Sequence, residues 1–146
     1  MTKPNIVGIH HLKFPVSDLE RSLAFYEAAF GARRKPELDH RDANGGLFAV
    51  ILEIPQLGTF LELRKDPHAA AAQRGFDPVS LSVVDQAALR SWSEHFAQLG
   101  YNHSPVLIGF VGWLLVIEDP DGRRIRLYTL ESHSSDLPHT KESPWL

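Results

Sequence analysis

The chain of 146 residues contains no cysteine. This absence excludes disulfide bonds, cysteine-held zinc and a thiol nucleophile, so a bound metal would need His, Asp or Glu ligands. No apolar run approaches the roughly 18 residues that a membrane-spanning helix requires. The first residues also lack the apolar core of a signal peptide. We therefore expect a cytoplasmic protein without a membrane partner.

An excess of basic residues is absent as well. The chain has 15 Lys and Arg against 18 Asp and Glu, a net charge of −3. This balance excludes a broad nucleic-acid-binding surface, and no glycine-rich loop joins a strand to a helix in the manner of a phosphate-binding site. The composition, 43% hydrophobic and 23% charged, is that of a globular protein.

The first half of the chain predicts a strand, a helix and three further strands. Residues 6–14 are rich in Ile, Val and Phe and favour a strand. Ser17 and Glu20 have the spacing of a capping box, and Gly31 is placed to end the helix. The predicted buried stripe of this helix is Leu19, Leu23, Tyr26 and Phe30. The three strand-like runs that follow are residues 33–39, 47–54 and 60–64, the first interrupted by Pro36.

The same order recurs after a connector rich in small residues. Asp85 is placed to cap a second helix, which Gly100 ends as Gly31 ends the first. The predicted stripe of this helix is Ala88, Trp92, His95 and Leu99. The strand-like runs are 78–84, 101–106, 110–118 and 123–130. We therefore predict an α+β chain of two βαβββ modules, residues 1–65 and 77–131, with a connector at 66–76 and a tail at 132–146.

The tail loses all periodicity and is rich in Ser, His and Pro. Two interpretations stay open. The tail is either a mobile end of the chain, or a segment whose Pro144-Trp145-Leu146 docks on the domain or on a partner subunit.

Three motifs relate the chain to a known family. They are His11 within Gly8-Ile9-His10-His11-Leu12, the helix sequence from Ser17 to Tyr26 followed by Phe30-Gly31, and Glu118-Asp119-Pro120-Asp121-Gly122. In these motifs the chain resembles the vicinal oxygen chelate superfamily, which includes glyoxalase I, bleomycin-resistance proteins and ring-cleaving dioxygenases. The resemblance implies two pseudo-twofold-related modules whose curled mixed sheets surround a cleft, in a homodimer that can complete the cleft across subunits.

The resemblance also implies four metal-ligand positions, on the first and last strands of each module. His11 and Glu62 fill the two positions of the first module. The second module has Pro78 and Arg126 there, and neither side chain can ligate a metal. We therefore expect no metal cofactor. The alternative is a Zn, Ni, Fe or Mn ion held by His11, Glu62 and non-standard further ligands, with lyase or dioxygenase chemistry.

Strand alternation predicts what the cleft contains instead of a metal. Lys13 shares a face with His11, Phe60 with Glu62, and Tyr128 with Arg126. By pseudo-symmetry we expect Arg126 to pair with Glu62 beside His11, in the place of the metal. The ligand would be a small anionic or carbonyl-containing organic molecule. The predicted ligand-binding residues are Lys13, Phe60, Trp113, Arg126 and Tyr128.

Whether the chain also catalyses a reaction stays open. Glu62 would act as general base and His11 as proton shuttle in a lyase, isomerase or dioxygenase-like enzyme. In the competing interpretation, Glu62 and Arg126 form a fixed ion pair in a bleomycin-resistance-like binding protein. The turn that contains His40 is interpreted as a solvated hairpin rather than as the edge of the cleft.

Overall fold

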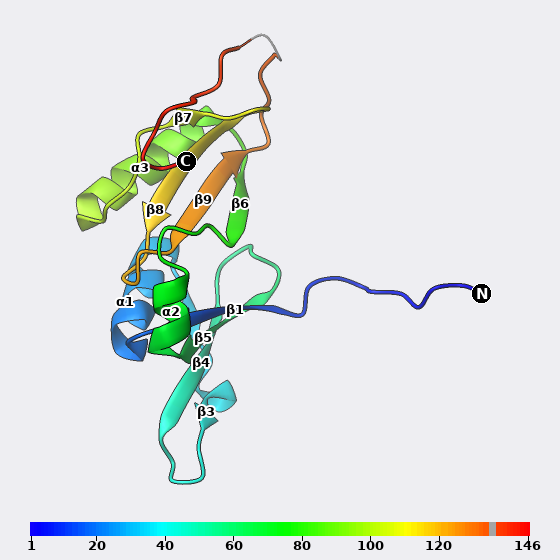
Figure 1. The fold of residues 1–146 in the computed structure, drawn as a ribbon, viewed down its shortest axis with the longest axis vertical. Helices are drawn as coiled ribbons and strands as arrows, with labels where there is room; N and C mark the ends of the chain where they lie inside the picture. The colour runs from blue at the N-terminus through cyan, green and yellow to red at the C-terminus, as the bar shows by residue number, and fades with distance from the viewer. Residues whose placement is uncertain (135–136) are drawn as a thin grey trace. The chain divides into compact units, whose positions relative to one another are not determined.

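The computed structural model describes residues 1–134 and 137–146, and the chain divides into two compact units, Met1–Ala70 and Ala71–Leu146. Each unit contains a mixed β-sheet and one long helix in the order strand, helix, strands (Figure 1). The predicted α+β class with two βαβββ modules is confirmed. No helix among the described residues combines the length and hydropathy needed to cross a bilayer.

Unit 1 has one helix packed on a five-stranded sheet. Its elements are β1 (His11–Val16), α1 (Leu19–Phe30), β2 (Arg33–Arg34), the 3₁₀ turn η1 (Pro36–Leu38), β3 (His40–Arg41), β4 (Leu47–Glu53) and β5 (Phe60–Lys65). The strand order is β1-β5-β4-β2, with β3 also paired to β4. The first and last strands, β1 and β5, run parallel, whereas β4 and β5 are antiparallel.

The strand predicted at residues 6–14 is displaced toward the C-terminus. β1 begins at His11 because its partner β5 begins directly opposite, at Phe60. Residues 1–10 therefore have no strand to pair with and are all exposed. Figure 1 shows them extending away from the rest of unit 1. The apolar composition of residues 6–10 predicted a strand, but these residues have no neighbouring strand to pair with.

Helix α1 is capped by Asp18, so the prediction that Ser17 caps it is wrong. The Asp18 carboxylate accepts a hydrogen bond from the Arg21 amide at 3.0 Å. Ser17 Oγ instead accepts one from the Arg21 guanidinium at 2.8 Å. A carboxylate is favoured here because it also faces the positive end of the helix dipole. The predicted end is confirmed, since Gly31 has the left-handed φ of 66°. The buried residues of α1 are Ser22, Phe25, Tyr26, Ala29 and Phe30.

The predicted strand at 33–39 keeps only two strand residues because Pro36 starts the turn η1. The Arg34 guanidinium grips Asp39 with two hydrogen bonds, Nε to Oδ1 at 3.0 Å and Nη2 to Oδ2 at 2.5 Å. The hydrogen bond to Asp39 raises the pKa of Arg34 above its usual value. These two hydrogen bonds bridge the turn η1, and they hold Asp39 directly before His40, the first residue of β3.

Unit 2 repeats the arrangement with four strands. Its elements are β6 (Val79–Val83), α3 (Gln86–Leu99), β7 (Leu107–Ile108), β8 (Trp113–Glu118) and β9 (Arg124–Thr129), after α2 (Pro67–Ala72), which spans the boundary between the units. The strand order is β6-β9-β8-β7, and β6 runs parallel to β9. Asp85 caps α3 at the Ala88 amide, as predicted. Gly100 ends the helix with a φ of 73°.

The strand predicted at residues 101–106 is absent from the described part of unit 2. Only His103 forms an isolated bridge, to Ile117. Ser104 explains the break, because its hydroxyl accepts the Val116 amide at 2.9 Å where a strand would offer a carbonyl. Regular pairing begins later, with β7.

The predicted stripe of α3 is one position out of phase. Leu89 and Phe96 are completely buried, whereas Leu99 is 38% exposed. Trp92 lies at the border of the buried face, with its ring 5.5 Å from that of Phe96. The prediction was shifted because it placed Trp92, which is only partly buried, at the centre of the buried face.

Alternation divides each sheet into a helix-covered face and a second face. On the helix-covered faces the strands bury apolar side chains, among them Leu61, Leu63, Val50 and Leu52 in unit 1 and Leu115, Ile117, Ile125 and Leu127 in unit 2. The residues between them point to the other face. On the last strands these are Glu62 in unit 1 and Arg126 in unit 2.

A buried ion pair holds the turn before β9. Arg123 Nη1 lies 2.6 Å from Asp119 Oδ2, and both side chains are 0% exposed. The other Asp119 oxygen accepts the amides of Asp121 and Arg123. Arg123 Nε donates to Gln73 at 2.8 Å. The turn thus depends on a charge pair that is isolated from water.

We predict that Arg123→Met lowers the free energy of unfolding by about 3–5 kcal/mol, because it leaves a buried carboxylate without its counter-charge. Arg41→Met is the matched control, since Arg41 is 54% exposed and 3.7 Å from Asp39. An exposed pair of this kind contributes less than about 1 kcal/mol. Urea unfolding monitored by circular dichroism measures both, and equal losses would contradict the prediction.

Candidate functional site

The most unusual polar residue of unit 1 is Glu62, in the middle of β5. Its side chain is only 5% exposed. Lys13 on β1 and Ile51 on β4 are its direct cross-strand neighbours. A buried carboxylate is unfavourable unless charged or hydrogen-bonding groups compensate it. The neighbours of Glu62 therefore define the site.

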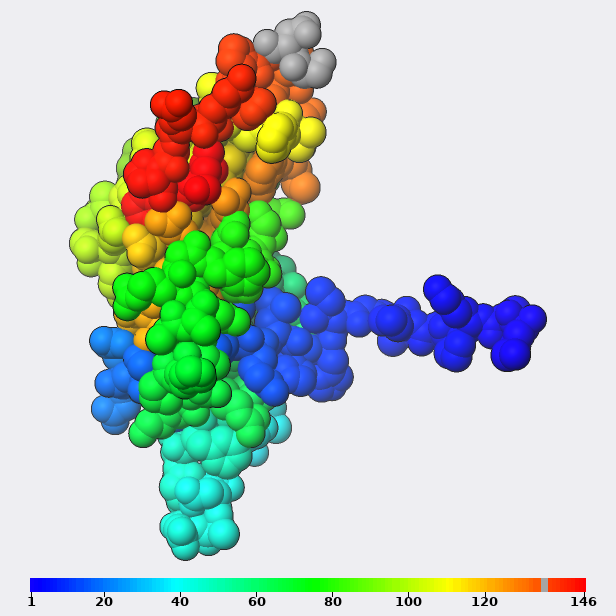
Figure 2. Space-filling view, viewed as in Figure 1, coloured from blue at the N-terminus to red at the C-terminus, as the bar shows by residue number. Residues whose placement is uncertain are grey.

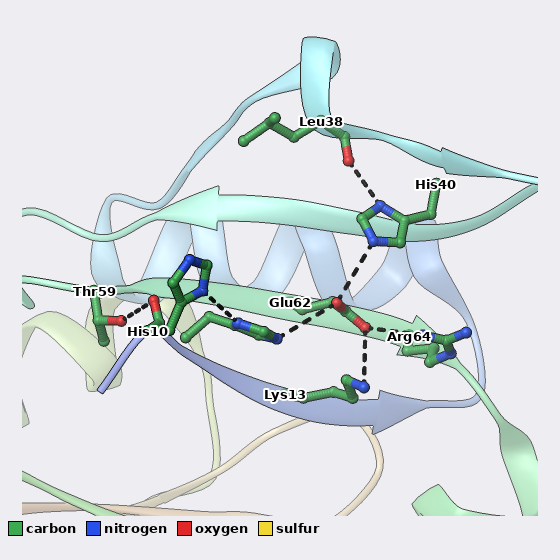
Figure 3. Close-up of polar contacts among 8 residues, drawn as sticks. His10, Lys13, Leu38, His40, Thr59, Glu62 and Arg64 are labelled. Carbon is green, nitrogen blue, oxygen red and sulfur yellow. Dashed lines mark hydrogen bonds and ion pairs between the residues drawn. The ribbon is translucent and has the colours of Figure 1, made fainter. Parts of the chain in front are cut away.

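Four basic side chains surround the Glu62 carboxylate, as Figure 3 shows. Lys13 Nζ and Arg64 Nη1 lie 3.9 and 3.4 Å from Oε2. His11 Nε2 and His40 Nε2 lie 3.9 and 3.8 Å from Oε1. One oxygen thus faces two permanent cations and the other faces two imidazoles. We call these five residues the Glu62 cluster.

The basic side chains of the cluster are exposed to solvent, although the Glu62 carboxylate is buried. The side chain of Lys13 is 50% exposed and that of Arg64 is 42% exposed. Arg64 is also held over the ring of Phe48, 5.0 Å from its centroid. With neutral histidines the cluster carries one net positive charge, from two permanent cations and one carboxylate. Such an arrangement can bind a ligand anion through charge-assisted hydrogen bonds.

The two histidines present the same nitrogen to Glu62. His40 Nδ1 lies 2.8 Å from the carbonyl oxygen of Leu38. A carbonyl can only accept, so Nδ1 carries the hydrogen and Nε2 is left to face the carboxylate. His11 Nδ1 lies 3.0 Å from His10 Nδ1. Both imidazoles are thus held by contacts of Nδ1, which direct Nε2 toward the carboxylate.

His40 is the residue of the cluster that sequence analysis missed. It was interpreted as part of a solvated hairpin, but β3 pairs with β4 and places His40 opposite Ala49. Ala49 in turn lies opposite Arg64 on β5. The small alanine leaves room between two larger polar side chains. Pro36 begins the turn η1, which separates β2 from β3. This proline is the sequence signal that could have indicated that the chain turns back to pair with β4.

The predicted residues of unit 1 come together. His11 lies opposite Phe60, and Lys13 lies opposite Glu62. All four share the face away from α1, as alternation predicted. Their roles in catalysis and ligand binding stay predictions.

The predicted residues of unit 2 have partners within their own unit. Arg126 forms an ion pair with Asp77. The Tyr128 hydroxyl accepts the amides of Val111 and Gly112 at 3.2 and 3.3 Å, and so holds the loop before β8. The predicted pair of Arg126 with Glu62 joins residues of different units, and it stays a prediction.

Trp113 does not share a face with Arg126. The β8–β9 register places Leu114 opposite Tyr128 and Val116 opposite Arg126. Trp113, one residue before Leu114, therefore points to the α3 side of the sheet. Its ring contacts His133 edge to face, with 5.2 Å between centroids. Within unit 2, Trp113 and Arg126 do not line one surface.

The cations on the Oε2 side of Glu62 oppose the binding of a metal ion there. The described residues contain no group of three or more His, Cys, Asp or Glu side chains placed to hold one. Oε2 of Glu62 faces an ammonium and a guanidinium, and these permanent cations would repel a divalent metal. Pro78 and Arg126, at the two remaining positions of the family pattern, offer no ligand.

Comparison with known proteins supplies an independent view. The family described as Glyoxalase/Bleomycin resistance protein/Dioxygenase superfamily matches residues 8–127. The metallothiol transferase FosB of Bacillus licheniformis is 28% identical, over 95% of this chain and 90% of that protein.

Two solved structures share the fold. The antibiotic-binding protein TnmS3 from Streptomyces sp. CB03234 superposes with a TM-score of 0.68 at 20% identity, covering 87% of this chain and 98% of that one. The fosfomycin resistance protein FosX from Listeria monocytogenes superposes with a TM-score of 0.66 at 17% identity, covering 85% and 92%. The two βαβββ units and the family match over residues 8–127 agree, and the chain belongs to the Glyoxalase/Bleomycin resistance protein/Dioxygenase superfamily.

Proposed function

We propose that this protein binds a small organic anion at the Glu62 cluster without the help of a metal. The observation that carries the proposal is the buried Glu62 carboxylate, which holds two half-exposed permanent cations beside each other. Glu62 neutralises part of their charge and positions them. The remaining charge of Lys13 and Arg64 is available to a ligand.

The geometry favours an anion with several oxygens. The guanidinium of Arg64 can donate two parallel hydrogen bonds, and Lys13 supplies a mobile point charge. The imidazoles of His11 and His40 can add donors at Nε2 when they are protonated. Carboxylates and phosphonates meet these requirements, whereas a neutral carbonyl compound would use only part of the available charge.

The relatives support a phosphonate in particular. A FosX structure from Listeria monocytogenes contains Mn(II) and 1S,2S-dihydroxypropylphosphonic acid, a small phosphonate. TnmS3, with the same fold, is named as an antibiotic-binding protein. We infer that the ligand of this chain belongs to the same broad class of small anionic metabolites or antibiotics.

Binding is the part of the function that the geometry supports best. Catalysis by Glu62 as general base and His11 as proton shuttle stays a prediction. The sequence-based alternative is a metal-dependent lyase or dioxygenase, in which His11 and Glu62 would ligate the ion. The structure adds His40 as a further histidine near Glu62. A cytoplasmic homodimer also stays a prediction.

We predict that Arg64→Met and Lys13→Met each weaken binding of 1S,2S-dihydroxypropylphosphonic acid at least about tenfold, which corresponds to about 1.4 kcal/mol. The loss should be largest at low salt, because screening already weakens such contacts at high ionic strength. Isothermal titration calorimetry measures the dissociation constants.

Lys35→Met is the matched control for these variants. Lys35 belongs to unit 1 and pairs with Glu37 and Glu53, outside the cluster. Its replacement should leave the dissociation constant unchanged within about twofold. If neither the phosphonate nor inorganic phosphate binds saturably, or if Lys35→Met weakens binding equally, the anion-binding proposal is wrong.

We also predict that the purified, untagged protein carries no stoichiometric Zn, Ni, Fe or Mn, because the cluster presents cations where a ligand set would be needed. Elemental analysis followed by titration with each metal tests this. One tightly bound ion per chain that is lost in both His11→Ala and His40→Ala would contradict the proposal and favour the metal-dependent alternative. His68→Ala is the control, since His68 is exposed on α2.

A further inference from the structure

The C-terminal tail docks on its own unit, so one of the two interpretations of residues 132–146 is supported. The Thr140 amide donates to the Ile108 carbonyl at 2.8 Å, and the Ile108 amide donates to Thr140 Oγ1 at 3.1 Å. The His139 ring lies 4.4 Å from that of Phe110. Figure 2 shows the tail lying along the surface of unit 2. Ser135 and Asp136 lie outside the described residues.

Trp145 reaches the second face of the unit 2 sheet. Its side chain packs against a buried cluster formed by Leu107, Leu114 and Val116. Tyr128 borders the same cluster. The strand register places Leu114, Val116 and Tyr128 on the face away from α3. The indole therefore fills an apolar seat on the face that carries Arg124 and Arg126.

Arg124 borders this seat. It lies opposite Glu118 on β8, but no ion pair of Arg124 is formed within 4.0 Å among the described residues. Its guanidinium lies 5.1 Å from the centre of the Trp145 ring, a cation–π contact. Arg124 Nε is buried, yet it makes no hydrogen bond within the described residues. Nε of the neighbouring Arg126 is also buried without a hydrogen bond, but Arg126 forms an ion pair with Asp77. A buried donor without an acceptor is unfavourable, and the face of an indole does not replace an anion.

The indole can leave without loss of the contacts that anchor the tail. Those anchors are at His139 and Thr140, five or more residues before Trp145. Near Trp145 itself the backbone hydrogen bonds are local, such as that from the Trp145 amide to Ser143 Oγ at 3.2 Å. The tail is therefore anchored at Thr140, while the Trp145 side chain can leave its apolar site and a ligand can take its place.

We propose that the seat of Trp145 is a binding site for an aromatic organic anion. The aromatic ring takes the place of the indole on Leu107, Leu114 and Val116, and the anionic group accepts hydrogen bonds from Arg124. The tail of this chain is the resident competitor, which the ligand displaces. The proposal rests on unit 2 alone and is independent of the Glu62 cluster.

Naphthalene-1-carboxylate is the probe for this site, and isothermal titration calorimetry measures its dissociation constant. We expect Trp145→Ala to bind it at least about tenfold more tightly than the wild type, because the internal competitor is removed. Trp145→Phe keeps an aromatic competitor and should stay within about threefold of the wild type. Unchanged or weaker binding by a folded Trp145→Ala protein overturns the proposal.

Arg124→Met tests the role of charge. It should weaken binding of the carboxylate at least about tenfold, while Arg90→Met, which removes an exposed arginine of α3, should not. The neutral naphthalene-1-carboxamide should bind the wild type at least about tenfold more weakly than the carboxylate. Equal effects of the two arginine variants, or equal affinities of the two probes, overturn the assignment of an anion site.

The wild-type protein provides a test that needs no destabilising substitution. The indole N–H resonance of Trp145, assigned from its loss in Trp145→Phe, should move toward the solvent-exposed position as naphthalene-1-carboxylate is added. The shift should saturate with the same dissociation constant that calorimetry gives. A Trp145 resonance that does not move at saturating probe shows that the indole is not displaced, and the proposal fails.

Discussion

In each unit the first strand pairs in parallel with the last, and the arrangement of the polar residues depends on this pairing. The pairing brings Lys13 opposite Glu62, although the two residues are far apart in the sequence. β4 and β3 then extend the sheet on the other side of β5 and add His40. Without the parallel pair, the carboxylate would lack Lys13 and His11 and would keep only Arg64 and His40 beside it.

The two units use one backbone plan for different chemistry. The strand registers make Glu62 equivalent to Arg126, and they make Lys13 equivalent to Ser80. Where unit 1 has a charged centre on this face, unit 2 has an apolar seat beside two arginines. The outer strands continue the contrast, because His40 occupies the place that Leu107 has in unit 2. This difference is why we propose a small polar anion for one unit and an aromatic anion for the other.

Several local features were predictable because they depend on neighbours in the chain. Asp85 caps α3, and Gly31 and Gly100 end their helices, since caps need only a few adjacent residues. Periodicity and glycine placement likewise predicted the repeated order of elements. The N-cap of α1, which is Asp18 and not Ser17, was a local error, but other errors arose where distant partners decide. Residues 6–10 have strand-forming composition but no partner strand, and Ser104 replaces a ladder carbonyl with its hydroxyl.

The sequence by itself therefore determined the fold class, the face on which Lys13 and Glu62 lie and the absence of ligating side chains at Pro78 and Arg126. Only the tertiary structure decided that His40 joins Glu62, that Trp113 points away from Arg126 and that Trp145 seats beside Arg124. The physical reason is that alternation along a strand is a local property, whereas cross-strand register and the docking of a tail depend on which distant segments pair.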